Sequence, residues 1–221
     1  MIGPPRFPQI GDGCSEDAAS RIVGLYDRHA AAWDRDRPRQ LFEKPWLDRF
    51  LALIAAEGAV LDIGCGSGEP LARAIVETGR AVTGIDASAA MISLCKSRLP
   101  RQRWLVADMR TLALGRRFDG LLAWDSFFHL TPDDQRLALR AIARHAAAGA
   151  ALMFTSGPRA GIAVGEYCGE ALYHASLDPP EYRTLLAQLG FEVLYHVAED
   201  PACGGRTVWL ARQTAGQTVP S

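Results

Sequence analysis

Three glycines with a period of two follow a short apolar segment near residue 60. Residues 60–68 read VLDIGCGSG, with Gly64, Gly66 and Gly68 in the turn and Asp62 just inside the apolar segment. Glycine allows a tight turn and lets a ligand approach without a Cβ in the way. A helix that begins behind such a turn presents unpaired amides. A carboxylate close by disfavours a pyrophosphate, so the pattern favours a ligand that carries an ammonium group.

Two more acidic residues follow apolar segments further along the chain. Asp86 ends the segment 81–85, and a carboxylate at the end of a second strand can accept both hydroxyls of a ribose. Asp108 follows the segment 104–107 and precedes Met109, where an acid would lie beside an adenine and accept from its amino group. The three acids therefore predict a site for an adenosine-like ligand.

The glycine spacing argues against a nicotinamide-dependent oxidoreductase. That fingerprint requires Gly-x-Gly-x-x-Gly. Counting from Gly64 the sixth residue is Glu69, and counting from Gly66 it is Leu71.

These elements, in this order over about residues 20–213, resemble the class I S-adenosylmethionine-dependent methyltransferases of the small-molecule type. The resemblance implies that the cofactor is S-adenosylmethionine, that the product is S-adenosylhomocysteine, and that no metal is needed. The residues that it implies for cofactor binding are Tyr26, Asp62, Gly64, Cys65, Gly66, Gly68, Asp86, Ala87, Ser88, Met91, Asp108, Met109 and Trp124.

An aromatic segment precedes the first predicted strand. Residues 25–33 (LYDRHAAAW) resemble the stretch that covers the cofactor in many small-molecule methyltransferases. Tyr26 and Trp33 would shield a sulfonium with their ring faces. The alternative is that both rings pack in the core from an amphipathic helix.

Methyl transfer from a sulfonium requires the nucleophile, the methyl group and the sulfur in line. A hydroxyl or carbon acid usually also needs a base. His129 follows the fourth predicted strand and is the candidate catalytic base, because its intrinsic pKa suits the task. Alternatively it only packs or binds a carbonyl. The candidate substrate-binding residues are Trp33, Asp125, Tyr167 and His174, of which His174 is also a second candidate base.

Regular elements must position these residues. Seven apolar segments alternate with helix-length stretches, which predicts an α/β, Rossmann-like, seven-stranded, mostly parallel sheet with helices on both faces and the last strand antiparallel. The predicted strands cover residues 59–63, 81–85, 104–107, 118–123, 150–155, 191–197 and 207–212.

A single domain over residues 1–221 is expected. Residues 1–57 would form an N-terminal arm and helical cover, with residues 1–14 as a loose arm. Residues 58–155 would form the cofactor-binding core. Residues 156–177, rich in glycine, would form a partly ordered substrate loop or lid. Residues 178–213 would form a helix and a strand pair, and residues 214–221 a frayed tail.

Composition limits the partners. The 221 residues have a net charge of −1, so no basic surplus attracts a phosphate backbone and no nucleic acid is expected. The residues after the fourth strand, 124–127, read WDSF and lack the Asn/Asp-Pro-Pro-Tyr of nucleobase N-methylating relatives. There is no apolar run of membrane-spanning length and no signal peptide pattern. The five cysteines are scattered, which predicts reduced thiols and a cytoplasmic location.

We therefore expect a methyltransferase that acts on a small molecule, as a monomer or homodimer. Two other functions remain open. One is a protein that binds S-adenosylmethionine without catalysis, and the other is a protein methyltransferase. The acceptor atom is not predicted by the sequence.

Overall fold

The computed structural model describes the backbone of residues 12–214 and the side chains of residues 17–214. Most of the predicted loose arm and nearly all of the predicted tail lie outside the described residues. A long helix, α1 (Asp12–Asp36), begins within the segment predicted as the arm and is followed by α2 (Lys44–Ala52). Both helices lie within residues 1–57, the segment predicted to form the arm and the helical cover.

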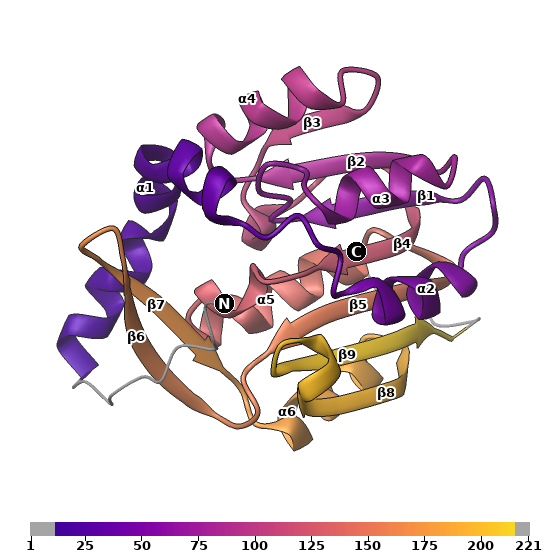
Figure 1. Ribbon diagram of the computed structural model, residues 1–221. Helices are drawn as coiled ribbons and strands as arrows, with labels where there is room; N and C mark the ends of the chain where they lie inside the picture. The colour runs from indigo at the N-terminus through magenta and orange to yellow at the C-terminus, as the bar shows by residue number, and fades with distance from the viewer. Residues whose placement is uncertain (1–11, 215–221) are drawn as a thin grey trace.

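A seven-stranded sheet forms the centre of the molecule (Figure 1). Its order is β3 (Arg103–Val106), β2 (Ala81–Asp86), β1 (Ala59–Ile63), β4 (Phe118–Ala123), β5 (Ala146–Ser156), β9 (Arg206–Gln213) and β8 (Phe191–Asp200). Neighbouring strands from β3 to β5 are parallel, and β9 is antiparallel to both β5 and β8. The predicted strands and the antiparallel last strand are confirmed.

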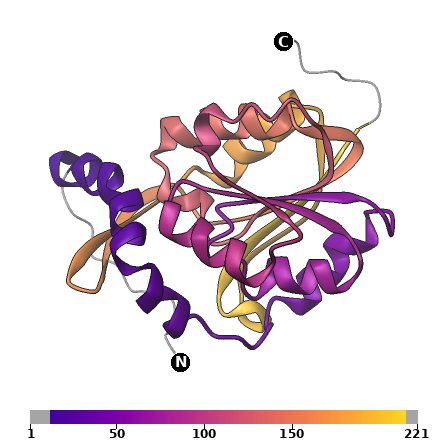
Figure 2. The same cartoon turned by 90° about the horizontal axis from the view of Figure 1, so that it is seen from above.

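Helices cover both faces of the sheet, which lies edge-on between them in Figure 2. On one face α2, α3 (Leu71–Glu77) and α4 (Ala89–Arg98) pack against residues such as Val60 and Val82. On the other face α5 (Pro132–Ala143) and α6 (Pro179–Gln188) pack against residues such as Leu61 and Ile63. Successive strand residues point to opposite faces, so a strand buried on both sides is mostly apolar.

Short 3-10 helices and side-chain caps fix the connections at the carboxyl edge. They are η1 (Met109–Thr111), η2 (Phe127–His129) and η3 (Pro201–Cys203). Ser88 caps α4 by accepting from the amide of Met91, and Thr131 caps α5 by accepting from the amide of Asp134. These caps satisfy amides that a helix start otherwise leaves unpaired.

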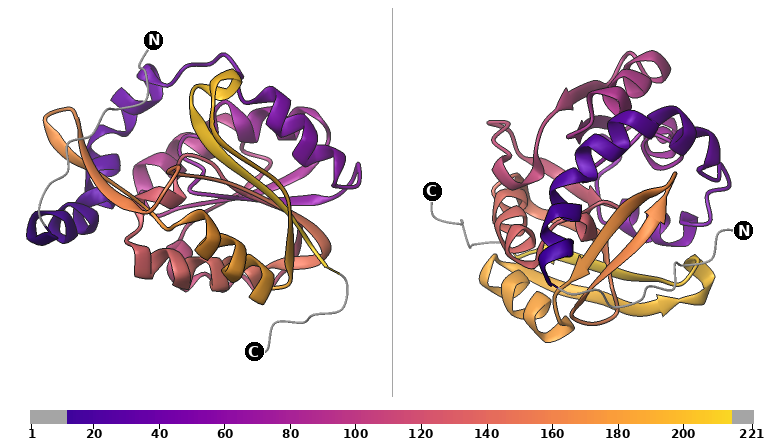
Figure 3. Two further views of the ribbon diagram at one scale, coloured as in Figure 1. Left: turned by 90° about the horizontal axis from the view of Figure 1, so that it is seen from below. Right: turned by 90° about the vertical axis from the view of Figure 1, so that its left-hand side faces the viewer.

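The segment 156–177 is more regular than the sequence predicts. It contains an antiparallel hairpin of β6 (Gly161–Tyr167) and β7 (Glu170–Ser176) instead of a partly ordered loop. The hairpin crosses α1 (Figure 3), where Tyr173 and Ala175 pack against Ala18 and Ile22. The small residues and glycines of this segment do not predict the pairing. The apolar side chains of the hairpin are buried against α1, a helix that is distant in the sequence.

Trp209 on β9 is expected to dominate the stability of the second half of the sheet. It is fully buried, its ring is parallel to that of Phe154 with centroids 5.7 Å apart, and it stacks on His196 at 3.7 Å. Replacing Trp209 by Ala should lower the free energy of unfolding by about 3–5 kcal/mol, measured by urea denaturation. Leu137→Ala, at an exposed position of α5, is the control and should cost much less. Equal losses in the two variants would contradict this assignment.

Candidate functional site

A cavity of about 310 Å³ opens at the carboxyl edge of the parallel strands, beneath α1. Its wall contains the glycine turn after β1 and the residues after β2, β3 and β4. Open α/β sheets bind ligands at this edge, where the order of the strands reverses between β1 and β4. The fold therefore gathers the three acids and the glycines predicted from the sequence into one site.

The glycine turn has two distinct roles in this wall. Gly64 has a φ of +69°, and a Cβ built on it would lie 2.3 Å from the Cβ of Ser126, so only glycine fits the packing. Gly66 has a φ of +53°, and a Cβ built on it would meet no described atom within 4 Å. Gly66 therefore leaves space beside the turn in which a ligand can lie.

Asp86 joins the glycine turn to the next helix. Its Oδ2 accepts from the amide of Gly66 and its Oδ1 from the amide of Ser88, both at 2.9 Å. Burial raises the pKa of the Asp86 carboxyl above its ordinary value, and these amide hydrogen bonds oppose that shift. The carboxylate is therefore fixed in direction at the end of β2.

Asp62 is a buried carboxylate that the protein does not pair. It is only 4% exposed and lines the cavity, and it makes no hydrogen bond or ion pair with any residue in the described part of the chain. Burial, followed by the nearby charge of Asp86, raises the pKa of Asp62 to about 7. A desolvated carboxylate of this kind is stabilised by a cation brought in by a ligand.

Asp108 lies at the rim of the cavity and is held by one arginine. Both of its carboxylate oxygens accept from the guanidinium of Arg110 at 2.6–3.0 Å, and these contacts lower the pKa of the Asp108 carboxyl. Arg110 also donates to Asp134 at 2.9 Å, which connects this rim to the start of α5.

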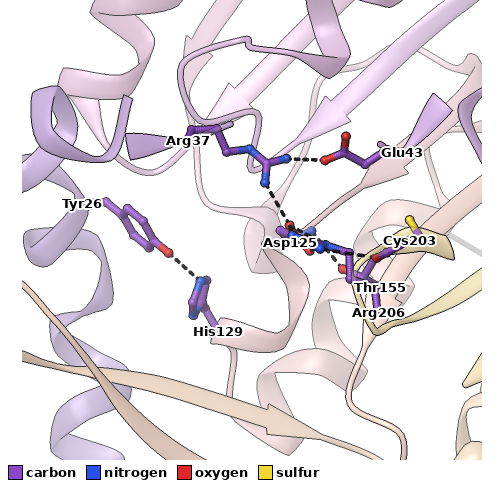
Figure 4. Close-up of polar contacts among 8 residues, drawn as sticks. All are labelled: Tyr26, Arg37, Glu43, Asp125, His129, Thr155, Cys203 and Arg206. Atoms are coloured by element: carbon purple, nitrogen blue, oxygen red, sulfur yellow. Dashed lines mark hydrogen bonds and ion pairs between the residues drawn. The ribbon is translucent and has the colours of Figure 1, made fainter. Parts of the chain in front are cut away.

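Tyr26 and His129 form a hydrogen-bonded pair across the cavity wall. The Nδ1 atom of His129 lies 2.8 Å from the carbonyl oxygen of Tyr173 and must donate to it. Its Nε2 atom is therefore the acceptor, and the Tyr26 hydroxyl donates to it at 2.8 Å (Figure 4). Burial lowers the pKa of His129 to about 4 and raises that of Tyr26 well above its usual value. Both side chains are neutral at pH 7.

Asp125 belongs to a charge network that sequence reasoning missed. Arg206 donates to both of its oxygens at 2.7–2.9 Å, and Arg37 donates to Oδ2 at 3.3 Å. Arg37 also donates to Glu43, which is fully buried, at 2.8 Å (Figure 4). Asp125 itself has a φ of +48°, uncommon for a residue with a side chain, which marks a sharp turn after β4.

Two aspartates of α1 hold this helix against both ends of α4. Asp27 accepts from the Ser88 hydroxyl at 2.6 Å and from the amide of Ala90 at 3.1 Å. Asp34 pairs with Arg98, and this pairing lowers the pKa of the Asp34 carboxyl well below its usual range. The C-terminal half of α1 is thus fixed over the glycine turn.

Most of the predicted site residues line one cavity. They are Tyr26, Trp33, Asp62, Gly64, Cys65, Gly66, Gly68, Asp86, Ala87, Ser88, Met91, Asp108, Met109, Trp124, Asp125 and His129.

Tyr167 and His174 are not in the described lining and lie on the hairpin instead. The Tyr167 ring meets the Trp33 ring edge-on at 5.4 Å, and the His174 ring lies 4.8 Å from that of His129. Each of these two rings thus contacts a ring that lines the cavity.

In residues 17–214 no group of three or more His, Cys, Asp or Glu side chains is arranged to hold a metal ion. None of the described helices is long and apolar enough to cross a membrane.

Comparison with known proteins identifies relatives in sequence. Residues 60–149 match a family model described as a methyltransferase domain. The chain is 32% identical over 127 residues to a dTDP-4-amino-2,3,4,6-tetradeoxy-D-glucose N,N-dimethyltransferase of Saccharopolyspora spinosa, covering 57% of this chain and 50% of that protein. It is 29% identical to an O-methyltransferase of Penicillium expansum, covering 86% of this chain and 74% of that protein. The chain thus spans about half the length of the first of these relatives.

Solved structures show the same fold. The 1,6-didemethyltoxoflavin N1-methyltransferase of Burkholderia thailandensis superposes with a TM-score of 0.69 at 20% identity, covering 95% of this chain and 94% of that one. The matched domain model, the strand order and the glycine turn with its acids agree with one another. Residues 60–149 thus match a methyltransferase domain, and the chain shares the fold of that solved methyltransferase.

Proposed function

We propose that this protein is an enzyme that transfers the methyl group of S-adenosylmethionine to a small molecule. The observation that carries the proposal is the cavity wall formed by Gly66, Asp86 and the unpaired Asp62. Together these residues suit an adenosine linked to an amino acid. Gly66 leaves open space, Asp86 is a fixed carboxylate for a diol, and Asp62 is a carboxylate that lacks a cation.

The residues present fit this cofactor group by group. Asp86 would accept from the ribose hydroxyls, and Asp108 with Met109 would flank the adenine. Asp62 would receive the ammonium group. When bound, S-adenosylmethionine supplies a methyl group on a positively charged sulfur. Tyr26 and Trp33, whose rings meet edge-on at 5.2 Å, would shield that charge and exclude water.

The Tyr26–His129 pair is the proposed proton-handling group. Its only basic lone pair, on His129 Nε2, already accepts from the Tyr26 hydroxyl. An acceptor hydroxyl would donate to the Tyr26 oxygen while the Tyr26 proton moves to Nε2. The Tyr173 carbonyl would then stabilise the imidazolium through Nδ1–H. Because its pKa is about 4, His129 is too weak a base to deprotonate an acceptor hydroxyl before the reaction. It suits a step in which the proton moves to His129 Nε2 while the methyl group is transferred.

A small-molecule acceptor is supported by the names of the relatives, which include amino-sugar N,N-dimethyltransferases and the toxoflavin-precursor enzyme. The net charge of −1 supports a partner other than nucleic acid. The four cysteines whose side chains are described are free thiols, which supports a cytoplasmic location. Binding without turnover and methylation of a protein are the competing functions.

Cofactor binding is the first test. Titration calorimetry should detect binding of S-adenosylmethionine and S-adenosylhomocysteine, and Asp86→Asn should weaken it about 10- to 100-fold because a hydrogen-bonded charge is lost. Asp48→Asn is the control, since Asp48 is exposed and pairs only with Lys44 among the described residues. If the native protein binds neither ligand, the proposed function is wrong.

The pH dependence of binding tests Asp62. Its carboxyl is largely protonated at pH 6 and largely ionised at pH 8, because its pKa is raised to about 7. Affinity for S-adenosylhomocysteine should therefore rise about 10-fold over this range, and Asp62→Asn should abolish the rise. The raised pKa also means that the unliganded fold loses stability as pH increases toward 7. Asp62→Asn should accordingly melt at a higher temperature than the native protein at pH 8.

The role of His129 is tested after an acceptor has been found by screening. His129→Gln and Tyr26→Phe should each lower kcat about 100-fold or more for a hydroxyl acceptor, with the Kd for the cofactor changed far less. Because the pKa of His129 lies near 4, protonation of this residue should not lower the kcat of the native enzyme between pH 8 and pH 5.5. An unchanged kcat in His129→Gln would remove this residue as the base.

A further inference from the structure

Two buried thiols are in contact where the glycine turn meets α4. The Sγ atoms of Cys65 and Cys95 lie 3.9 Å apart, although the two residues are 30 positions apart in the sequence. Both residues are buried, and both are free thiols. The two sulfurs would have to come about 2 Å closer to reach the S–S bond length of a disulfide.

The two thiols share one backbone partner in the glycine turn. Cys65 stands in the turn itself, and Cys95 lies on α4. The Sγ of Cys95 donates to the carbonyl oxygen of Gly66 at 3.1 Å, and the Sγ of Cys65 donates to the same oxygen at 3.8 Å. A disulfide would remove both donors from Gly66, whose amide is the one that Asp86 binds.

The sulfurs have little space in which to move alone. A Cβ built on Gly84 would lie 3.0 Å from the Sγ of Cys65, and a Cβ built on Gly68 would lie 3.3 Å from the Sγ of Cys95. Because close packing on these sides limits rotation of the two side chains, a disulfide would draw the glycine turn toward α4. The cavity wall at Gly66 would change shape.

Only one of the two thiols faces the cavity. Cys65 is part of the described lining, whereas Cys95 is not and is fully buried. A small oxidant in the empty cavity would therefore meet Cys65 first. A ligand that lies against the glycine turn would cover this approach.

We infer that Cys65 and Cys95 are a reversible oxidation site, and that a disulfide between them weakens cofactor binding. The oxidant that this inference names is a small hydroperoxide. The inference concerns regulation of the cofactor site, and it rests on the proposed function.

The reaction has two steps. The Cys65 sulfur takes a hydroxyl group from hydrogen peroxide and releases one water, which leaves a sulfenic acid. The Cys95 sulfur then attacks the Cys65 sulfur, forms the S–S bond and displaces the hydroxyl as a second water. In total the two thiols lose two hydrogen atoms, and the peroxide is reduced to two waters. A dithiol reductant restores both thiols by exchange.

Burial makes this oxidation slow. Burial, followed by the contact with Cys95, raises the pKa of the Cys65 thiol well above its ordinary value. The thiolate, which is the form that attacks a peroxide, is therefore scarce at neutral pH. The site would respond to prolonged exposure to peroxide, and occupied cofactor sites would respond more slowly still.

Oxidation is measured first, without reference to cofactor binding. The reduced protein is treated with hydrogen peroxide, and non-reducing peptide mapping by mass spectrometry follows the peptide pair linked through Cys65 and Cys95. We expect this linked pair to form in the free protein. Its formation should be at least about 10-fold slower with S-adenosylhomocysteine at 100 times its Kd, because few sites are then empty.

Cofactor binding is measured next on the same samples. In titration calorimetry the oxidised protein should bind S-adenosylhomocysteine at least about 10-fold more weakly than the reduced protein, and dithiothreitol should restore the affinity. By linkage, saturating S-adenosylhomocysteine should raise the reduction potential of the pair by about 30 mV for each tenfold difference in affinity.

Two variants identify the thiols responsible. The double variant Cys65→Ala/Cys95→Ala cannot form the disulfide, so peroxide should change its own affinity by less than about twofold. Cys168→Ser is the matched control, because Cys168 is exposed on the hairpin, and this variant should respond to peroxide as the native protein does.

The outcomes separate this inference from the proposed function. The inference is wrong if no linked pair forms, if the linked protein binds S-adenosylhomocysteine as tightly as the reduced protein, or if dithiothreitol does not restore the affinity. A response that disappears in Cys168→Ser, or that persists in the double variant, would also overturn it. If the reduced native protein does not bind S-adenosylhomocysteine at all, the proposed function fails, whether or not the linked pair forms.

Discussion

The site depends on carboxylates that the parallel sheet forces together. Parallel strands end at one edge, so the acids at or just beyond the ends of β1, β2 and β3 share that edge whatever their separation along the chain. Asp86 and Asp108 are satisfied there by backbone amides and by Arg110, but Asp62 is not. Burial raises the pKa of the Asp62 carboxyl, and a cation brought by a ligand would stabilise its ionised form.

The helix α1 completes the site without belonging to either layer of helices. Its aspartates bind the two ends of α4, and Tyr26, on the same helix, reaches His129 on the far wall. One helix therefore connects the glycine turn after β1 to the 3-10 helix after β4. Because these contacts are polar and directional, they fix the rotation of α1 about its axis more tightly than apolar packing alone would.

The sequence predicts the sheet and the cofactor wall well, because their signals are local. The glycine turn, Asp86 and Asp108 each stand at the end of an apolar segment, and the alternation of strands and helices predicts a mostly parallel sheet. The Arg37 network is different. Its members come from the α1–α2 segment, the end of β4 and the start of β9, and ion pairs between such distant residues leave no periodic pattern. The partner of His129 was hidden for the same reason, since Tyr26 precedes it by 103 positions.

The hairpin of β6 and β7 packs against α1, the helix that covers the cavity. Glu170 at its tip binds His29 at 2.6 Å and also pairs with Arg28, while the described lining of the cavity contains no hairpin residue. A change in the length or shape of the hairpin would thus act on α1, on which Tyr26 and Trp33 lie, and leave the glycine turn as it is. In a protein built this way, the cover of the cavity and its floor are encoded in separate stretches of the gene. Evolution can therefore reshape the cover while the glycine turn and its acids are inherited unchanged.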